Sequence, residues 1–88
     1  MAIMVTLHPF LNDGVEAKVE VQGRDVGECL KDIMKRFTGI DKKLFGSNGK
    51  LKGYVEIMVN GQSTYPQELA YPVKDGDSVS VLVFLAGG

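Results

Sequence analysis

The chain has few of the residues from which most catalytic and metal-binding sites are built. Its 88 residues include one cysteine, one histidine and no tryptophan. A single cysteine excludes an internal disulfide and a cysteine-rich zinc or iron–sulfur site, so packing alone must hold the fold, and the expected compartment is the reducing cytoplasm. No run approaches the roughly 18 apolar residues of a membrane span. Residues 1–11 lack a basic segment before their apolar stretch, so we do not expect a secretory signal.

What the chain does contain describes one small soluble domain. Hydrophobic residues make up 44% of the sequence and charged residues 24%. That composition is too apolar for a disordered chain. We expect a single domain over residues 1–85 and a flexible tail over residues 86–88.

Charge is distributed unevenly along the chain. Residues 31–52 contain seven basic residues against Asp32 and Asp41, a local net charge of +5, which leaves −6 elsewhere because the total is −1. The segment has three interpretations: cations beside a helix C-terminus on a solvated face, a docking surface for an acidic partner, or a nucleic-acid patch. Nucleic acid is disfavoured, because the total charge is slightly negative and only Phe37 and Phe45 supply aromatic rings there.

Alternating apolar residues predict most of a β-sheet. Residues 3–7 alternate in the manner of a strand with one buried face. A turn signal at 12–14 separates them from a second alternating stretch over 15–21, which predicts a hairpin.

The second half of the chain repeats this strand pattern. A third strand is predicted over 55–59, and Asn60-Gly61 predicts a tight hairpin after it. A short fourth strand begins near Gln62, and two later prolines confine it to an edge of the sheet. The most strand-like run is the last, over 78–85.

One helix is predicted between the second and third strands. Asp25 is its expected N-cap, and Glu28 is expected to bond back to the backbone N–H of Asp25. Gly39 can supply a left-handed C-cap, so the helix covers about residues 25–38. Residues 40–53 show no sustained period and are predicted as a long connection whose apolar residues pack against the helix end. Apolar residues at three-and-four spacing define the buried helix face: Val26, Cys29, Leu30, Ile33, Met34 and Phe37.

This order of elements predicts an α+β fold with a mixed four- to five-stranded sheet packed on one main helix, in which the first and last strands are parallel neighbours. The arrangement resembles the β-grasp, or ubiquitin-like, fold. Such domains include ferredoxins, RNA-binding modules, protein tags and sulfur carriers, so the fold alone does not decide the function.

The sequence offers no catalytic constellation of its own. Cys29 falls on the apolar helix face and His8 on the outward side of a strand, so we expect a structural role for the first and a surface role for the second. Residues 46–50 lack the spacing of a phosphate-binding loop. Asp75-Gly76-Asp77 has too few oxygen ligands for an EF-hand site and is interpreted as a turn. No bound metal or cofactor is expected.

The sheet face that points away from the helix is a candidate binding surface. One helix cannot cover both faces, so alternation along the strands predicts an exposed apolar patch, and such patches mark docking sites. The alternative is that loop residues such as Phe10 or Tyr71 fold over it. Tyr54 and Ser80 are expected on the same face. The predicted partner-binding residues are Met4, Thr6, Met58, Leu82 and Phe84.

The end of the chain is its most distinctive feature. Ala86-Gly87-Gly88 follows a core strand with no polar spacer. Three extended residues reach about 10 Å, so the carboxylate of Gly88 would stand close to a rigid body. Glycines lack a Cβ and can enter a channel too narrow for other residues. This geometry suits delivery of the carboxylate into the active site of another protein.

Three segments resemble the MoaD/ThiS family of sulfur carrier proteins: Val59-Asn60-Gly61, residues 72–79 around the Asp-Gly-Asp turn, and the terminal Ala86-Gly87-Gly88. The resemblance implies that an E1-like adenylyltransferase uses ATP to adenylate the carboxylate of Gly88. A persulfide or sulfurtransferase then replaces AMP with sulfur, and the thiocarboxylate supplies a sulfur-accepting synthase. It also implies a carrier rather than an enzyme, whose patch around Leu82 and Phe84 docks on each partner in turn.

The pathway and two other classes of function remain open. The length and the long connection resemble the small subunit of molybdopterin synthase, which is the preferred assignment, whereas the ending over residues 84–88 resembles carriers of the thiamine or cysteine pathways. One alternative is a ubiquitin-like modifier whose Gly88 is joined to lysines. Another is a β-grasp binding module, such as one for RNA, whose terminal glycines have no role.

Overall fold

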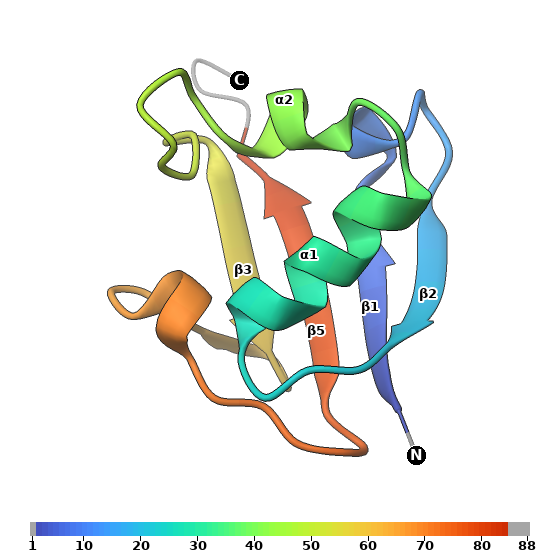
Figure 1. Ribbon diagram of the computed structural model, residues 1–88, viewed down its shortest axis with the longest axis vertical. Coiled ribbons are helices and arrows are strands. Elements are labelled where there is room, and N and C mark those ends of the chain that lie inside the picture. Colours follow the sequence, from blue (N-terminus) through green and yellow to red (C-terminus); the bar gives the residue numbers. More distant parts are fainter. Residues whose placement is uncertain (1, 85–88) are drawn as a thin grey trace.

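The computed structural model describes residues 2–84, which form a five-stranded mixed sheet with α1 lying across one face (Figure 1). The strand order is β2-β1-β5-β3-β4, with β1 parallel to β5 and the other neighbours antiparallel. This is the predicted β-grasp fold. The elements in chain order are β1 (Ile3–Leu7), the 3₁₀ turn η1 (Pro9–Leu11), β2 (Ala17–Val21), α1 (Val26–Arg36), α2 (Ile40–Leu44), β3 (Val55–Val59), β4 (Gln62–Ser63), the 3₁₀ turn η2 (Glu68–Ala70) and β5 (Ser78–Val83).

The strands follow the predicted alternation with small changes at their ends. β2 begins at Ala17 rather than at residue 15, because Asp13 and Gly14 have positive φ angles and complete the turn, which leaves Val15 exposed. β5 is described to Val83, and Leu85, the predicted last strand residue, lies outside the described residues. The β3–β4 hairpin turns at residues 60 and 61 with φ angles of 51° and 82°, as expected for an Asn-Gly turn.

The core lies between α1 and the inward face of the sheet. The inward residues of β1, β3 and β5 are at most 5% exposed, apart from the partly buried Val83. Burial of this apolar area is the main stabilising term for the domain. The core residues are Ile3, Val5, Leu7, Leu11, Val21, Val26, Cys29, Leu30, Ile33, Ile40, Leu44, Val55, Ile57, Val59, Val79 and Val81.

The helix α1 starts as predicted and its cap differs in one detail. The Asp25 side chain accepts a hydrogen bond of 2.8 Å from the Glu28 backbone N–H. The Glu28 carboxylate accepts its return bond from Arg24, at 2.7 Å, rather than from Asp25. Asp25 pairs instead in an isolated β-bridge with Pro72, which turns its backbone toward that segment. The predicted C-terminal end is wrong: α1 ends at Arg36 with Phe37 as its C-cap, and Gly39, although left-handed with a φ of 87°, is the N-cap of α2.

The prediction of an irregular connection over residues 40–53 is wrong in part. The five residues of α2 place Ile40 and Leu44 four positions apart on one buried side. A β-bridge between Phe45 and Leu51 closes the rest into a short loop, and both side chains pack against the core as expected. A helix of little more than one turn gives no repeating period, which is why the pattern alone does not identify it.

Candidate functional site

The outer face of the sheet gathers the predicted partner-binding residues from three strands. Thr6 of β1 and Met58 of β3 flank Ser80 of β5 in register. Met4 lies two residues before Thr6 on the same face and pairs with Ser78. Because the alternate residues of these strands are buried beneath α1, this row of side chains faces away from the helix.

The outer face is more polar than predicted. Leu82 is half-buried and lies opposite Glu56, whose carboxylate accepts a hydrogen bond of 2.8 Å from the Ser63 hydroxyl. Lys18 and Glu20 of β2 occupy the positions beside β1. Met4 is 39% exposed and Phe84 is 59% exposed, whereas the other three predicted residues are half-buried. The apolar surface is therefore small and interrupted by charged side chains.

Three aromatic residues, Phe10, Tyr54 and Phe84, lie where β5 ends, and we call them the aromatic cluster although only the first two are in ring contact. Phe84 donates its backbone N–H to the Tyr54 carbonyl at 2.7 Å. The prediction that Tyr54 lies on the outer face is wrong. Its hydroxyl donates to the Lys43 carbonyl of α2 at 3.4 Å, and its ring packs against the core. The rings of Phe10 and Tyr54 form a T-shaped pair, with their centroids 6.1 Å apart and their planes at 86°.

Neither loop aromatic covers the outer face. Phe10 stays at the end of the sheet and is 47% exposed, so it adds to the accessible surface there. Tyr71 lies beside α1, where its carbonyl accepts the N–H of Val26. Sequence reasoning did not select Phe10 as a site residue; the only signal for it was an aromatic residue directly after the Pro9 that ends a strand.

The predicted tail residues Ala86, Gly87 and Gly88 lie outside the described residues. The last described residue is Phe84, at the end of a central strand bonded on both sides. The proposed attachment site therefore follows the aromatic cluster by four residues in the sequence.

Cys29 is enclosed and His8 has a local structural role. The Cys29 side chain is fully buried, and burial followed by the charges of Asp25, Glu28 and Asp32 raises its pKa to about 11. The structural role predicted for this thiol agrees with that environment. His8 is more than a bland surface residue, because its Nδ1 accepts the Phe10 N–H at 3.0 Å and caps η1.

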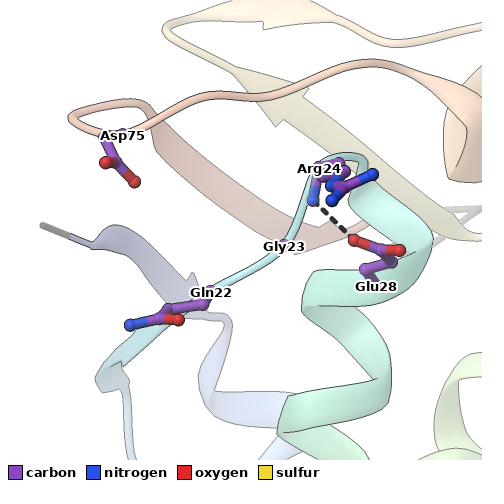
Figure 2. Close-up of a pocket in the computed structure, with 5 residues that line it drawn as sticks. All are labelled: Gln22, Gly23, Arg24, Glu28 and Asp75. Atoms are coloured by element: carbon purple, nitrogen blue, oxygen red, sulfur yellow. Dashed lines mark hydrogen bonds between the residues drawn. The ribbon is translucent and has the colours of Figure 1, made fainter.

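A polar hollow lies at the opposite end of the sheet (Figure 2). Its lining residues are Gln22, Gly23, Arg24, Glu28 and Asp75. Gly23 approaches α1 so closely that an added Cβ would meet the Cys29 backbone nitrogen at 3.0 Å. The hollow lies near the start of β5, a strand about 17 Å long at the usual rise per residue, so it is far from the chain's exit. It offers no second site for tail chemistry.

Asp77 confirms the interpretation of residues 75–77 as a turn. Its carboxylate accepts hydrogen bonds from the Asn60 side chain at 3.0 Å and from the Lys74 backbone N–H at 2.9 Å. The Asn60 bond, followed by the Lys74 bond, lowers the pKa of Asp77. Asn60 also accepts the Ser78 N–H, so the pair joins the hairpin turn to the start of β5.

The part of the chain that the structure describes contains neither a metal-binding cluster nor a membrane-spanning helix. Among residues 2–84, no three histidine, cysteine or acidic side chains lie close enough together to hold a metal ion. No helix within the same residues has the length and apolar character needed to cross a membrane.

Comparison with known proteins identifies relatives across the whole chain. The sulfur carrier protein CysO of Mycobacterium tuberculosis is 33% identical over 91 residues, covering 100% of this chain and 96% of the relative. A chain of the Amycolatopsis orientalis BexX/CysO complex superposes with a TM-score of 0.82 and 30% identity, covering 99% of this chain and all of that one. The crystal structure of M. tuberculosis CysO gives a TM-score of 0.79 and 28% identity, covering 94% and 99%.

The relative from M. tuberculosis is a sulfur carrier protein, which agrees with the interpretation of this chain as a carrier rather than an enzyme. The model of the ThiS family matches residues 6–88, which run from within β1 through β5 to the terminal glycines. The chain therefore belongs to the ThiS family.

Proposed function

We propose that this chain is a sulfur carrier that works through the carboxylate of Gly88. The observation that carries the proposal is the anchoring of the chain at Phe84, by β5 between its two neighbours and by the bond to Tyr54. Four further residues span at most about 14 Å, so the carboxylate stays within that reach of a fixed point. We assign residues 1–85 to the domain and 86–88 to the tail.

The chemistry we propose needs no base, metal or cofactor from the carrier. A carboxylate is a poor electrophile, so an E1-like adenylyltransferase first joins the Gly88 oxygen to the α-phosphate of ATP and releases pyrophosphate. A persulfide sulfur then attacks the acyl carbon and AMP leaves. A second thiol cleaves the resulting acyl disulfide, which leaves the thiocarboxylate. Cys29 takes no part, because a buried thiol of raised pKa is neither accessible nor ionised at neutral pH.

The partners would bind the outer face and the end of the sheet. Leu82 and Phe84, with Met4, Thr6 and Met58, are the residues we assign to docking. The same surface would serve the activating enzyme, the sulfur donor and the sulfur-accepting synthase, so these partners would exclude one another. The relative found in the BexX/CysO complex supports binding to a partner protein.

The relatives favour a carrier of the CysO type. The relative that shares 33% identity with this chain is named CysO. We therefore propose a CysO-type carrier and keep the molybdopterin and thiamine pathways as alternatives. We place the carrier in the cytoplasm, because its proposed cycle consumes ATP and reduced thiols.

Intact-protein mass spectrometry tests the function directly. The purified chain is incubated with ATP, the E1-like enzyme of the same organism and a persulfide source. We expect a mass shift equal to the exchange of one oxygen for one sulfur, mapped to Gly88. A chain lacking Gly88 is the control and should not shift. No shift, or a shift mapped to Cys29, would overturn the proposal, and higher-mass lysine conjugates in cells would favour a ubiquitin-like modifier.

A further inference from the structure

Basic side chains gather beside the point from which the C-terminal residues continue. Lys42 and Lys43 belong to α2, and Lys52 lies just before β3. Lys42 and Lys52 line one open hollow between α2 and the following loop, together with a single acidic residue, Asp41. We call these three lysines the basic rim. In Figure 1, α2 and this loop lie at the end of the sheet where β5 finishes.

The basic rim is connected to Phe84 through Tyr54. The Tyr54 carbonyl accepts the Phe84 N–H at 2.7 Å, and the Tyr54 hydroxyl donates to the Lys43 carbonyl at 3.4 Å. The Lys52 Nζ atom lies 5.8 Å from the centre of the Tyr54 ring. A partner that receives the chain beyond Phe84 would therefore face the rim as well.

Within residues 2–84, intramolecular pairing neutralises little of this charge. Lys43 forms an ion pair of 3.1 Å with Asp13, whose side chain is 95% exposed, so the pair is weak. No ion pair joins Lys42 or Lys52 to an acidic side chain in the described part. The dipole of α2 accounts for cations in its last turn but not for Lys52, which lies outside the helix.

We propose that the basic rim docks on an acidic protein segment beside the active-site entrance of the activating enzyme. The inference rests on the proposed function, because it specifies the partner surface that meets the chain's exit. Charge complementarity at the edge of an interface speeds association and fixes orientation, while the apolar contacts supply affinity. An acidic protein is favoured over nucleic acid because the whole chain carries a net charge of −1, which would repel a polyanion.

The test compares two variants of equal charge change. Lys42→Glu/Lys52→Glu reverses the rim, and Lys31→Glu/Lys35→Glu reverses two exposed lysines of α1 as the matched control. The rate of pyrophosphate release by the activating enzyme is measured against carrier concentration at several salt concentrations. We expect the rim variant to lose at least about tenfold in kcat/KM at low salt with little change in kcat, and the loss to shrink as salt screens the charges.

Several outcomes decide the proposal. The neutral variant Lys42→Gln/Lys52→Gln should give an intermediate loss, and thermal melts establish that each variant is folded. Equal kcat/KM and equal salt dependence for the rim and control variants would overturn the proposal that the basic rim docks on the activating enzyme. If the wild-type chain binds a labelled single-stranded oligonucleotide and only the rim variant loses this binding, the rim binds nucleic acid and the proposal of an acidic protein partner is wrong. If the wild-type chain is not adenylated at all, the proposed function fails, whereas normal wild-type turnover with an unaffected rim variant rejects this inference alone.

Discussion

At the scale of single residues, Cys29 and Asp77 show how local surroundings decide what a reactive group does. Cys29 is the one thiol of a chain that we propose to carry sulfur, yet it is fully buried and its pKa is raised to about 11. Asp77 is an acid in a turn that could suggest a cation site, yet its oxygens are engaged by Asn60 and Lys74. Both groups serve the fold rather than the chemistry.

The burial of Cys29 leads to a direct prediction about sulfur loading. Cys29→Ala should take up sulfur at Gly88 as fast as the wild type, because the thiol is neither exposed nor ionised. In the native protein Cys29 should also react with a thiol reagent far more slowly than after denaturation, as measured by absorbance. A folded Cys29→Ala chain that fails to load would show that the thiol relays sulfur.

The lowered pKa of Asp77 leads to a prediction about the stability of the domain in acid. Its pKa is lower in the folded chain than the usual value of about 4, so its stabilising contribution is complete above that pH and is lost as the pH falls toward the folded value. Asp77→Asn should be less stable than the wild type at neutral pH, and its free energy of unfolding should depend less on pH below about 5. Urea unfolding between pH 3 and pH 7 measures both. Parallel pH profiles for the two proteins would rule out this role.

At the scale of elements, β5 links the core to the proposed docking surface. Val79 and Val81 are fully buried beneath α1, while Leu82 lies on the outer face and Phe84 follows the strand's last residue. A charged residue in place of Leu82 or Phe84 therefore changes the outer surface with little effect on packing beneath the helix.

Substitution on β5 tests this surface. Leu82→Glu and Phe84→Glu should weaken binding to the activating enzyme by about tenfold or more, because each buries an unpaired charge in an interface. Gln22→Glu adds the same charge at the opposite end of the molecule and should bind normally. Titration calorimetry supplies the affinities. Unchanged affinity in both β5 variants would move the docking site elsewhere.

The elements also show which features sequence patterns can predict. Period-two alternation identified the strands, and the period of α1 identified Ile33 and Leu30 as buried, because a long element repeats its pattern several times. α2 has five residues and too little length to do so. Tyr54 precedes Val55, the first residue of β3, so strand alternation does not govern its ring; contact with α2 does. The positions of such residues depend on tertiary contacts that no local pattern records.

At the scale of the whole molecule, the two ends of the sheet differ in kind. One end carries the aromatic cluster, the basic rim and the exit at Phe84. The other carries the polar hollow and the Asp77 turn, and the hydrogen bonds that Asn60 makes with Asp77 and Ser78 hold the start of β5 in place. β5 lies between β1 and β3 and runs from one end of the sheet to the other. The end that makes the proposed partner contacts is therefore joined directly to the core of the domain.

This division of the molecule predicts that folding and carrier activity can be separated at the tail. A chain ending at Ala86 keeps every residue of β5 and the Phe84–Tyr54 bond, so its thermal midpoint should match that of the full chain within a few degrees. Its sulfur loading should be lost completely, because the proposed attachment residue is gone. Calorimetry and intact-protein mass spectrometry measure the two effects on one sample. A midpoint that falls by about 8 °C or more would mean that residues 87 and 88 contribute to the core, and retained loading would place the sulfur on another group.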